Sequence, residues 1–215
     1  MSRLNSNRRI QIDTSEPRYD EGDSNDGSEF QPSNSDATED LDPFMGVKVR
    51  RKASRLRDYQ GDYIDVRPRP HLMKILEKQG DRKVLFADKV IKFTGSGKMK
   101  RRILLVTDFA IYIADPETDA LKRRVALAAV EKLCLSELID NFFAINIPTE
   151  YDLLMASTRK TEIVTVLVDA TKSASDYELE VALSNRFEYS AAADVVKEVQ
   201  FEEVEGGVKT RIVQR

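Results

Sequence analysis

Short runs of apolar residues, alternating with polar ones and separated by turn residues, fill the chain from residue 84 onward. This pattern is typical of antiparallel strands joined by tight turns, and it does not fit βαβ units. The expected strands span residues 84–94, 101–107, 110–114, 122–127, 132–135, 142–147 and 151–156. The pattern therefore predicts a meander of seven strands.

Two segments have the spacing of amphipathic helices instead. Residues 72–78 place Leu72, Ile75 and Leu76 on one helical face, and Gly80 is suited to end that helix. Residues 161–172 are β-rich in propensity, but their aliphatic side chains recur at helical intervals, which favours a helix. Further strands are expected at residues 178–183, 199–204 and 208–213, with a hairpin turn at residues 205–207.

Composition divides the chain into three parts. Residues 1–43 are rich in Asp, Glu, Ser, Asn and Gly, so they cannot bury enough apolar surface to fold, and we expect a disordered acidic tail. Residues 44–82 are expected to be a polybasic and helical segment, and residues 83–215 the β domain. The predicted fold class is therefore mostly β (α+β), an antiparallel β-sandwich or barrel capped by a C-terminal-side helix, with an N-terminal helical extension and a C-terminal hairpin.

Charge is segregated along the chain. Residues 1–46 hold 4 Lys or Arg against 11 Asp or Glu, a net charge of −7, whereas residues 47–102 hold 18 against 6, a net charge of +12. Residues 103–215 hold 12 against 20, a net charge of −8. A basic segment of this strength predicts an anionic partner, which charge alone does not identify as lipid, nucleic acid or protein.

The basic residues gather on a predicted hairpin. Two strand-like runs flank Gly95-Ser96-Gly97, and a three-residue loop there places Thr94 opposite Lys98 and Lys92 opposite Lys100. Period-two alternation then puts Arg102 on the same face. Like charges directly opposite one another destabilise a sheet, so a bound phosphate would relieve the repulsion.

Two alternatives remain open at this point. A two-residue turn would place Lys92 opposite Arg101 or Met99, which separates the cations. The lysines also suit a solvated edge hairpin, where charge discourages pairing with another chain.

A second basic run precedes the domain. Its residues suit a polybasic membrane anchor, a nuclear-localisation patch or a charged linker, and the position next to a basic domain favours the anchor. Ser54 follows Arg51-Lys52-Ala53, a pattern that basophilic kinases recognise, and its phosphorylation would weaken anion binding by adding about −2 charge. The auxiliary basic residues are Arg50, Arg51, Lys52, Arg55 and Arg57.

Catalytic and metal chemistry find no support in the sequence. The single histidine, His71, and the single cysteine, Cys134, provide neither a zinc set nor a nucleophile relay. Gly95-Ser96-Gly97-Lys98 resembles the end of a P-loop, but Met99 stands where Ser or Thr is required. We expect no enzyme activity, no cofactor and no metal.

Other residues of the chain also point away from a reactive centre. Four carboxylates near turns are interpreted as solvated turn residues, because no base, nucleophile or metal-ligand pattern accompanies them: Asp108, Asp115, Glu117 and Asp119. Nucleic-acid binding is not expected either, because no aromatic residues interleave with the hairpin cations.

From about residue 44 to the end, the chain resembles the tail homology 1 domain of class I myosins. The similarity rests on six blocks in the family's order, at residues 57–64, 86–93, 104–108, 140–145, 150–154 and 160–165. It implies a divergent pleckstrin-homology fold that binds phosphoinositides through a Lys on the first strand and Lys/Arg-x-Arg on the second. Lys92, Lys100 and Arg102 match that pattern, which also implies the three-residue loop, and Lys98 lies beside them.

The resemblance has a limit, because the chain contains no P-loop and no IQ pattern, so we expect a myosin tail domain without a motor head. The expected function is a peripheral membrane-binding module that docks on anionic phospholipids and links membrane to the actin-myosin cytoskeleton. The alternative is a cytoskeletal scaffold that binds actin or a myosin partner. Either function places the chain in the cytoplasm, on membranes or at the cell cortex.

Overall fold

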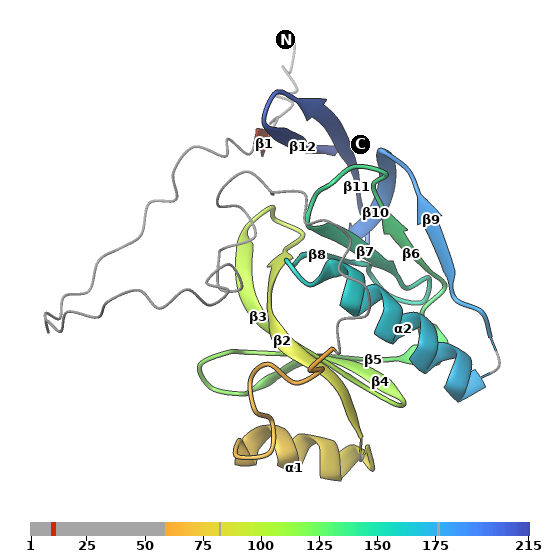
Figure 1. The fold of residues 1–215 in the computed structure, drawn as a ribbon. Coiled ribbons are helices and arrows are strands. Elements are labelled where there is room, and N and C mark those ends of the chain that lie inside the picture. Colours follow the sequence, from red (N-terminus) through yellow and green to blue (C-terminus); the bar gives the residue numbers. More distant parts are fainter. Residues whose placement is uncertain (1–9, 12–58, 82, 176) are drawn as a thin grey trace, which may run out of the picture.

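The computed structural model describes residues 10–11, 59–81, 83–175 and 177–215 (Figure 1). The predicted acidic tail, apart from residues 10–11, lies outside the described residues, and so does the basic run of residues 50–57. The described residues fold into one eight-stranded sheet, a smaller four-stranded sheet and two α-helices. The prediction of a mostly β, α+β fold is confirmed.

The main sheet contains the predicted meander. Its strand order is β5-β4-β3-β2-β8-β7-β6-β9, with a short 3₁₀ helix, η1 (Leu127–Ala129), between β5 and β6. Its strands are β2 (Val84–Phe93), β3 (Met99–Thr107), β4 (Ala110–Ala114), β5 (Leu121–Ala126), β6 (Lys132–Leu135), β7 (Phe142–Asn146), β8 (Leu153–Ala156) and β9 (Glu180–Leu183). All seven predicted meander strands are confirmed, and the eighth strand, β9, runs parallel to β6.

The long strand β2 connects the two halves of the meander. It pairs with β3 along its whole length and with β8 only at its end, through Ile91 and Lys92. The curled sheet encloses the main hydrophobic core, which α2 (Lys160–Ser175) covers with Ile163 and Leu167. The helix predicted at residues 161–172 is thus confirmed, because its apolar face has a core to bury against.

A second, four-stranded sheet is formed mainly by the end of the chain. It has the order β1-β12-β11-β10 and lies above the main sheet in Figure 1. Its strands are β1 (Ile10–Gln11), β10 (Arg186–Ala192), β11 (Val195–Val204) and β12 (Gly207–Gln214). The hairpin of β11 and β12 was predicted, but β10 was missed, although its buried Phe187, Tyr189 and Ala191 alternate with more exposed residues.

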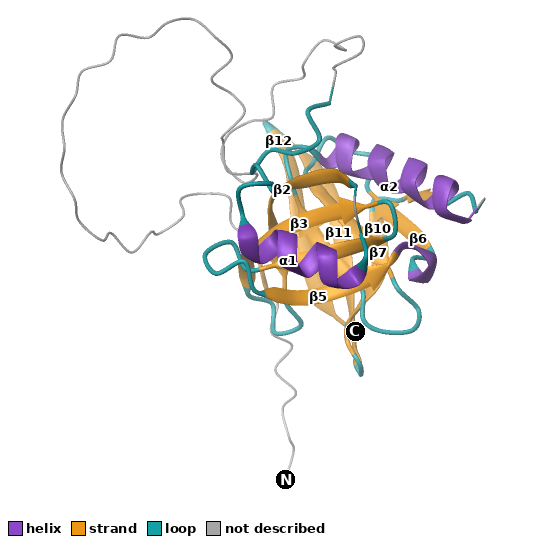
Figure 2. Cartoon of the chain, turned by 90° about the horizontal axis from the view of Figure 1, so that it is seen from below, coloured by secondary structure: helices purple, strands orange, loops and turns teal. Residues whose placement is uncertain are grey.

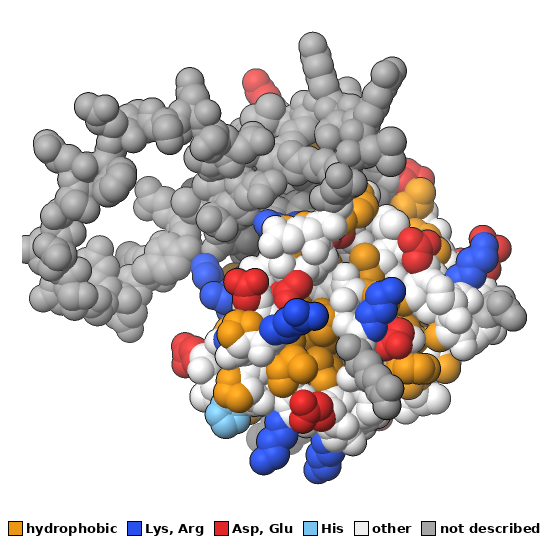
Figure 3. All heavy atoms as spheres, turned by 60° about the horizontal axis from the view of Figure 1, so that its bottom comes forward, with side chains coloured by type: hydrophobic (Ala, Val, Ile, Leu, Met, Phe, Trp, Pro, Cys, Tyr) orange, Lys and Arg blue, Asp and Glu red, His pale blue; other side chains and the backbone are white. Residues whose placement is uncertain are grey.

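Helix α1 (Pro70–Gln79) covers the outer face of the meander, and Figure 2 shows it lying across the strands. Leu72 and Leu76 are buried against Leu105 and Tyr112. Gly80 adopts the left-handed conformation at the C-cap, as predicted, and its N–H bonds back to the helix. Beside α1 a shallow cavity of 620 Å³ opens on the face shown in Figure 3, where apolar side chains lie among charged ones.

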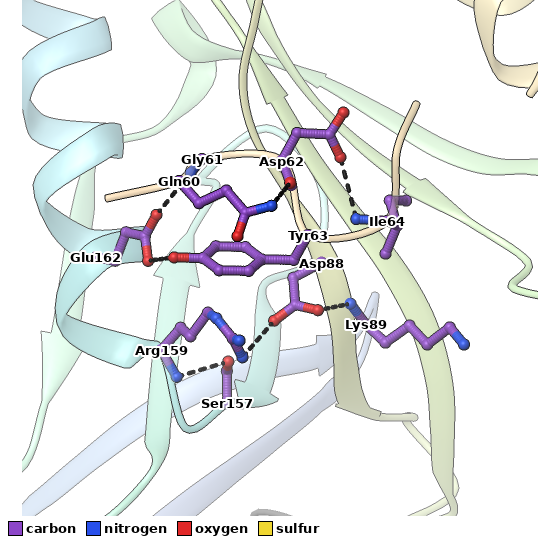
Figure 4. A network of polar contacts seen from close by, with 10 residues as sticks. All are labelled: Gln60, Gly61, Asp62, Tyr63, Ile64, Asp88, Lys89, Ser157, Arg159 and Glu162. Atoms are coloured by element: carbon purple, nitrogen blue, oxygen red, sulfur yellow. Dashed lines mark hydrogen bonds and ion pairs between the residues drawn. The ribbon is translucent and has the colours of Figure 1, made fainter. Parts of the chain in front are cut away.

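The segment before α1 is fastened to both β2 and α2. Gly61 accepts a backbone hydrogen bond from Ala87 N–H at 2.7 Å, and Tyr63 N–H donates to Ala87 O at 2.8 Å. The Tyr63 hydroxyl donates to the buried carboxylate of Glu162 at 2.7 Å (Figure 4), and burial raises the pKa of Glu162. Arg159, whose guanidinium lies 3.8 Å from the Tyr63 ring centre, bonds to Asp88 at 3.2 Å.

The close approach of this segment to β2 explains why residue 61 is a glycine. Its φ is +76°, and a Cβ there would lie 2.8 Å from the carbonyl oxygen of Leu85, which is backbone and cannot move aside cheaply. Described residues of three of the sequence blocks that carry the resemblance, at residues 57–64, 86–93 and 160–165, therefore meet at one place in the fold.

Gly61→Ala tests this attachment. Gly206→Ala is the matched control, because Gly206 also has positive φ, +90°, but nothing lies within 4 Å of its Cβ position. We expect Gly61→Ala to lower the free energy of unfolding in urea by about 1–2 kcal/mol more than the control does, because only Gly61 adds a steric clash to the backbone strain. Equal losses in the two variants would show that the segment is not held against β2.

Candidate functional site

The β2-β3 hairpin has the register predicted for a three-residue loop. Lys92 lies opposite Lys100, and Val90 lies opposite Arg102. Thr94 N–H donates to Lys98 O at 2.9 Å, and Gly97 N–H donates to Thr94 O at 2.8 Å. The alternative two-residue turn is thereby excluded.

The hairpin cations continue the face that lines the main core. Val90 and Leu104 belong to that core, and side chains alternate along a strand, so Lys92 and Arg102 point to the same face two residues further along. The core residues end where the lysines begin. The cations therefore stand at one open end of the curled sheet, partly buried in the case of Lys92 and Arg102 and exposed in the case of Lys100.

A fourth cation, Arg123 on β5, belongs to the same group. The pKa of Lys92 is lowered first by burial and then by the positive charges of Arg123, Arg102 and Lys100. We call Lys92, Lys100, Arg102 and Arg123 the open-end cluster. Lys98, also predicted to bind phosphate, is exposed at the end of the hairpin loop.

Arg123 was missed although a strand was predicted at residues 122–127, because it stands in the charged run Lys122-Arg123-Arg124 and was not distinguished from its neighbours. The signal that would have identified it is strand alternation, since Arg123 is two residues from the buried core residue Val125.

Acidic residues compensate part of the cluster. Asp115 accepts from Arg102 Nη1 at 3.3 Å and lies 3.8 Å from Lys122 Nζ, while Asp119, which is buried, pairs with Arg69 at 2.8 Å. The interpretation of Asp115 and Asp119 as solvated turn residues is therefore wrong, because the turn after β4 folds back over basic side chains. For Lys92 and Lys100 the described part of the chain provides no carboxylate within 4 Å.

The second sheet braces the hairpin loop. Lys197 on β11 is buried, and its Nζ donates to Gly95 O at 2.7 Å. Burial lowers the pKa of Lys197. Gly95 also packs so closely on β10 that a Cβ there would lie 3.0 Å from Ala191 O. The loop position thus depends on residues about one hundred positions away, which local sequence patterns do not reveal.

The remaining predicted basic residues, Arg50, Arg51, Lys52, Arg55 and Arg57, lie outside the described residues together with Ser54, so their roles stay predictions. Neither described helix is long and apolar enough to cross a bilayer. Within the described ranges, no group of three or more His, Cys, Asp or Glu residues is arranged to hold a metal ion. The arrangement at the open end is suited to holding an anion.

Comparison with known proteins gives a family match over most of the chain. The profile of a family described as "unconventional myosin tail, actin- and lipid-binding" matches residues 50–214. Myosin ID heavy chain from Dictyostelium discoideum is 34% identical over 145 residues, which cover 61% of this chain and 13% of that protein. Myosin heavy chain IB from Acanthamoeba castellanii is 32% identical over 168 residues, which cover 74% of this chain and 15% of that protein.

The chain thus spans 13% and 15% of the length of these two relatives, and the similarity lies in its tail-like region. Among solved structures, the hSac2 domain from human phosphoinositide phosphatase Sac2 is 17% identical with a TM-score of 0.39, and the match covers 53% of this chain and 87% of that one. A score this low supports no further conclusion.

Lys197→Met tests the brace. Loss of one hydrogen bond worth about 1 kcal/mol should let the loop open more often, so exchange of the Gly97 amide hydrogen should accelerate about fivefold. Lys209→Met, on the neighbouring strand β12, is the control and should leave that amide unchanged. Unaltered exchange in the Lys197 variant would mean that the buried ammonium does not fix the loop.

Proposed function

The chain belongs to the unconventional myosin tail family, described as actin- and lipid-binding, and on this premise we propose that it docks on anionic phospholipids through the open-end cluster. The family description supports lipid binding in general, and the hairpin geometry supports this surface as the place. The chain acts in this proposal as a binding module at a membrane surface or the cell cortex.

One observation carries the proposal. Lys92 and Lys100 face each other across the hairpin, and no carboxylate of the described chain neutralises either. Burial and neighbouring cations make the charged form of Lys92 costly, as its lowered pKa reflects. A phosphate at this position would neutralise the repulsion that the fold creates, and Arg102 can add a charge-assisted hydrogen bond.

The expected strength follows from the number of contacts. Each Lys or Arg near an anionic leaflet contributes roughly 1 kcal/mol, and this contribution weakens as salt screens it. Lys92, Lys100 and Arg102 alone thus give weak binding, and the basic run of residues 50–57 is proposed to add further contacts. Together they bring the affinity toward the micromolar range.

Vesicle co-sedimentation of Lys92→Ala against Lys89→Ala tests the site. Lys89 is exposed on the same strand but, three residues away, points to the opposite face, so the two variants lose the same charge from different sides. On vesicles of phosphatidylcholine with phosphatidylserine or phosphatidylinositol bisphosphate, we expect Lys92→Ala to bind about fivefold more weakly at low salt.

The difference between the two variants should shrink at higher ionic strength. If both variants bind as the unaltered chain does, or if both weaken equally, the cluster is not the lipid site and binding reflects general charge.

The family description also names actin, which supports a second candidate, a cytoskeletal scaffold. Co-sedimentation with actin filaments in the absence of lipid separates the two functions. If the chain is a scaffold, it should pellet with filaments. The Lys92→Ala variant should then pellet equally well, because that function does not need the open-end cluster. A chain that stays in solution with filaments but pellets with vesicles would exclude the scaffold.

A further inference from the structure

Arg123 lies within reach of Lys92 but is held differently from the hairpin cations. We propose that Arg123 and Lys92 form a second phosphate subsite beside Lys100 and Arg102, so that the open end selects headgroups that carry two ring phosphates over headgroups that carry one. The inference rests on the proposed function and adds to it the residue that sets headgroup specificity.

The first support is the burial of the Arg123 guanidinium. Its side chain is 7% exposed, and Nε and Nη2 lie 3.1 and 2.9 Å from Glu150 Oε2. Nη2 also donates to the carbonyl oxygen of Tyr151 at 2.7 Å. These bonds fix the plane of the guanidinium, and they leave its remaining nitrogen, Nη1, out of the contacts with Glu150 and Tyr151 O.

That remaining nitrogen, Nη1, has no hydrogen-bond partner in the described chain although it is buried. A buried donor without an acceptor costs roughly 1–3 kcal/mol, and more when it is charged. Structures rarely retain such a group unless a ligand or an ordered water completes it. A buried guanidinium nitrogen without a partner, on the same aromatic ring as a lysine that no carboxylate reaches, is suited to an acceptor that carries negative charge.

The second support comes from Tyr151, which contacts both cations. Arg123 Cζ lies 3.9 Å and Lys92 Nζ 5.6 Å from the centre of its ring. The face of an aromatic ring carries negative potential and attracts cations. The Tyr151 ring therefore partly compensates the charge of Lys92, which no described carboxylate reaches. Tyr151 belongs to the segment between β7 and β8 and is 36% exposed, so its ring lies between the two cations and the solvent-accessible surface.

The geometry also indicates the kind of ligand. Lys100 and Arg102 come from β3, Lys92 from β2 and Arg123 from β5, so the four cations border the opening from three strands. One phosphate between Lys92 and Lys100 leaves Arg123 Nη1 without an acceptor, whereas a second phosphate on the same ring could provide it. A planar guanidinium suits this role because it can bind phosphate oxygens through two donors.

The experiment measures selectivity and overall affinity separately. The full chain is titrated with phosphatidylcholine vesicles that contain phosphatidylinositol monophosphate or bisphosphate at equal total charge, and the ratio of the two affinities is recorded. Arg123→Lys keeps the charge but loses the fork, and Arg124→Lys on the same strand is the control, because Arg124 interacts with Asp81 and Tyr112 instead. We expect the ratio to fall about threefold in Arg123→Lys and to stay constant in Arg124→Lys.

Glu150→Gln provides a readout that loss of structure cannot imitate. It leaves Arg123 in place and removes the carboxylate that competes for it, so the preference for the bisphosphate should rise about twofold. Soluble inositol trisphosphate should compete with the vesicles for binding, and the variants should rank in the same order in this competition. That ranking would show that the headgroup and not the membrane surface is selected.

Two results would overturn the subsite. Unchanged ratios in Arg123→Lys and Glu150→Gln, with Lys92→Ala still weakening all binding, would limit Arg123 to holding the β7-β8 segment and would leave the proposed function standing. If Lys92→Ala also binds normally, the proposed function fails together with the subsite.

Discussion

Repulsion between like charges at the open end of the sheet is the interaction on which the account depends. Burial lowers the pKa of Lys92 most, and the positive charges of Arg123, Arg102 and Lys100 lower it further. Because folding lowers the pKa of Lys92, its charge opposes folding at neutral pH, and this cost is relieved only as pH rises through the lowered pKa toward the ordinary range of lysine. A bound anion removes the same cost without deprotonation, so affinity for phosphate is a consequence of how the chain folds.

The rest of the fold keeps these charges together. The register of β2 and β3 places two lysines opposite each other, and the closure of the meander by β5 brings Arg123 to them. Lys197 fixes the loop from the second sheet, and the contacts of Gly61 and Tyr63 fasten the chain to β2 and α2 at the other end of the same strand. Asp115 and Glu150 balance Arg102 and Arg123, which leaves Lys92 and Lys100 as the members of the open-end cluster that no described carboxylate pairs with.

Local patterns predicted the parts of the site that depend on neighbours in sequence. Alternation placed Lys92, Lys100 and Arg102 on one face once the family resemblance implied the three-residue loop, and helical spacing identified α1 and α2. Contacts between distant segments were not predictable in this way. The partnership of Arg102 with Asp115, the approach of Arg123 and the brace from Lys197 all depend on how strands curl in three dimensions. Strand β10 shows a different failure, since its alternation was present but small residues such as Ala191 and Ser190 weakened the signal.

The central claim is that the fold crowds positive charge around Lys92 until an anion relieves it, and the most direct test is an NMR titration of the lysine side chains with and without soluble inositol trisphosphate. The account predicts that the pKa of Lys92 lies below the ordinary value of lysine in the free chain and rises when the headgroup is added. A pKa of Lys92 at the ordinary value, or one that does not respond to the headgroup, would contradict the account.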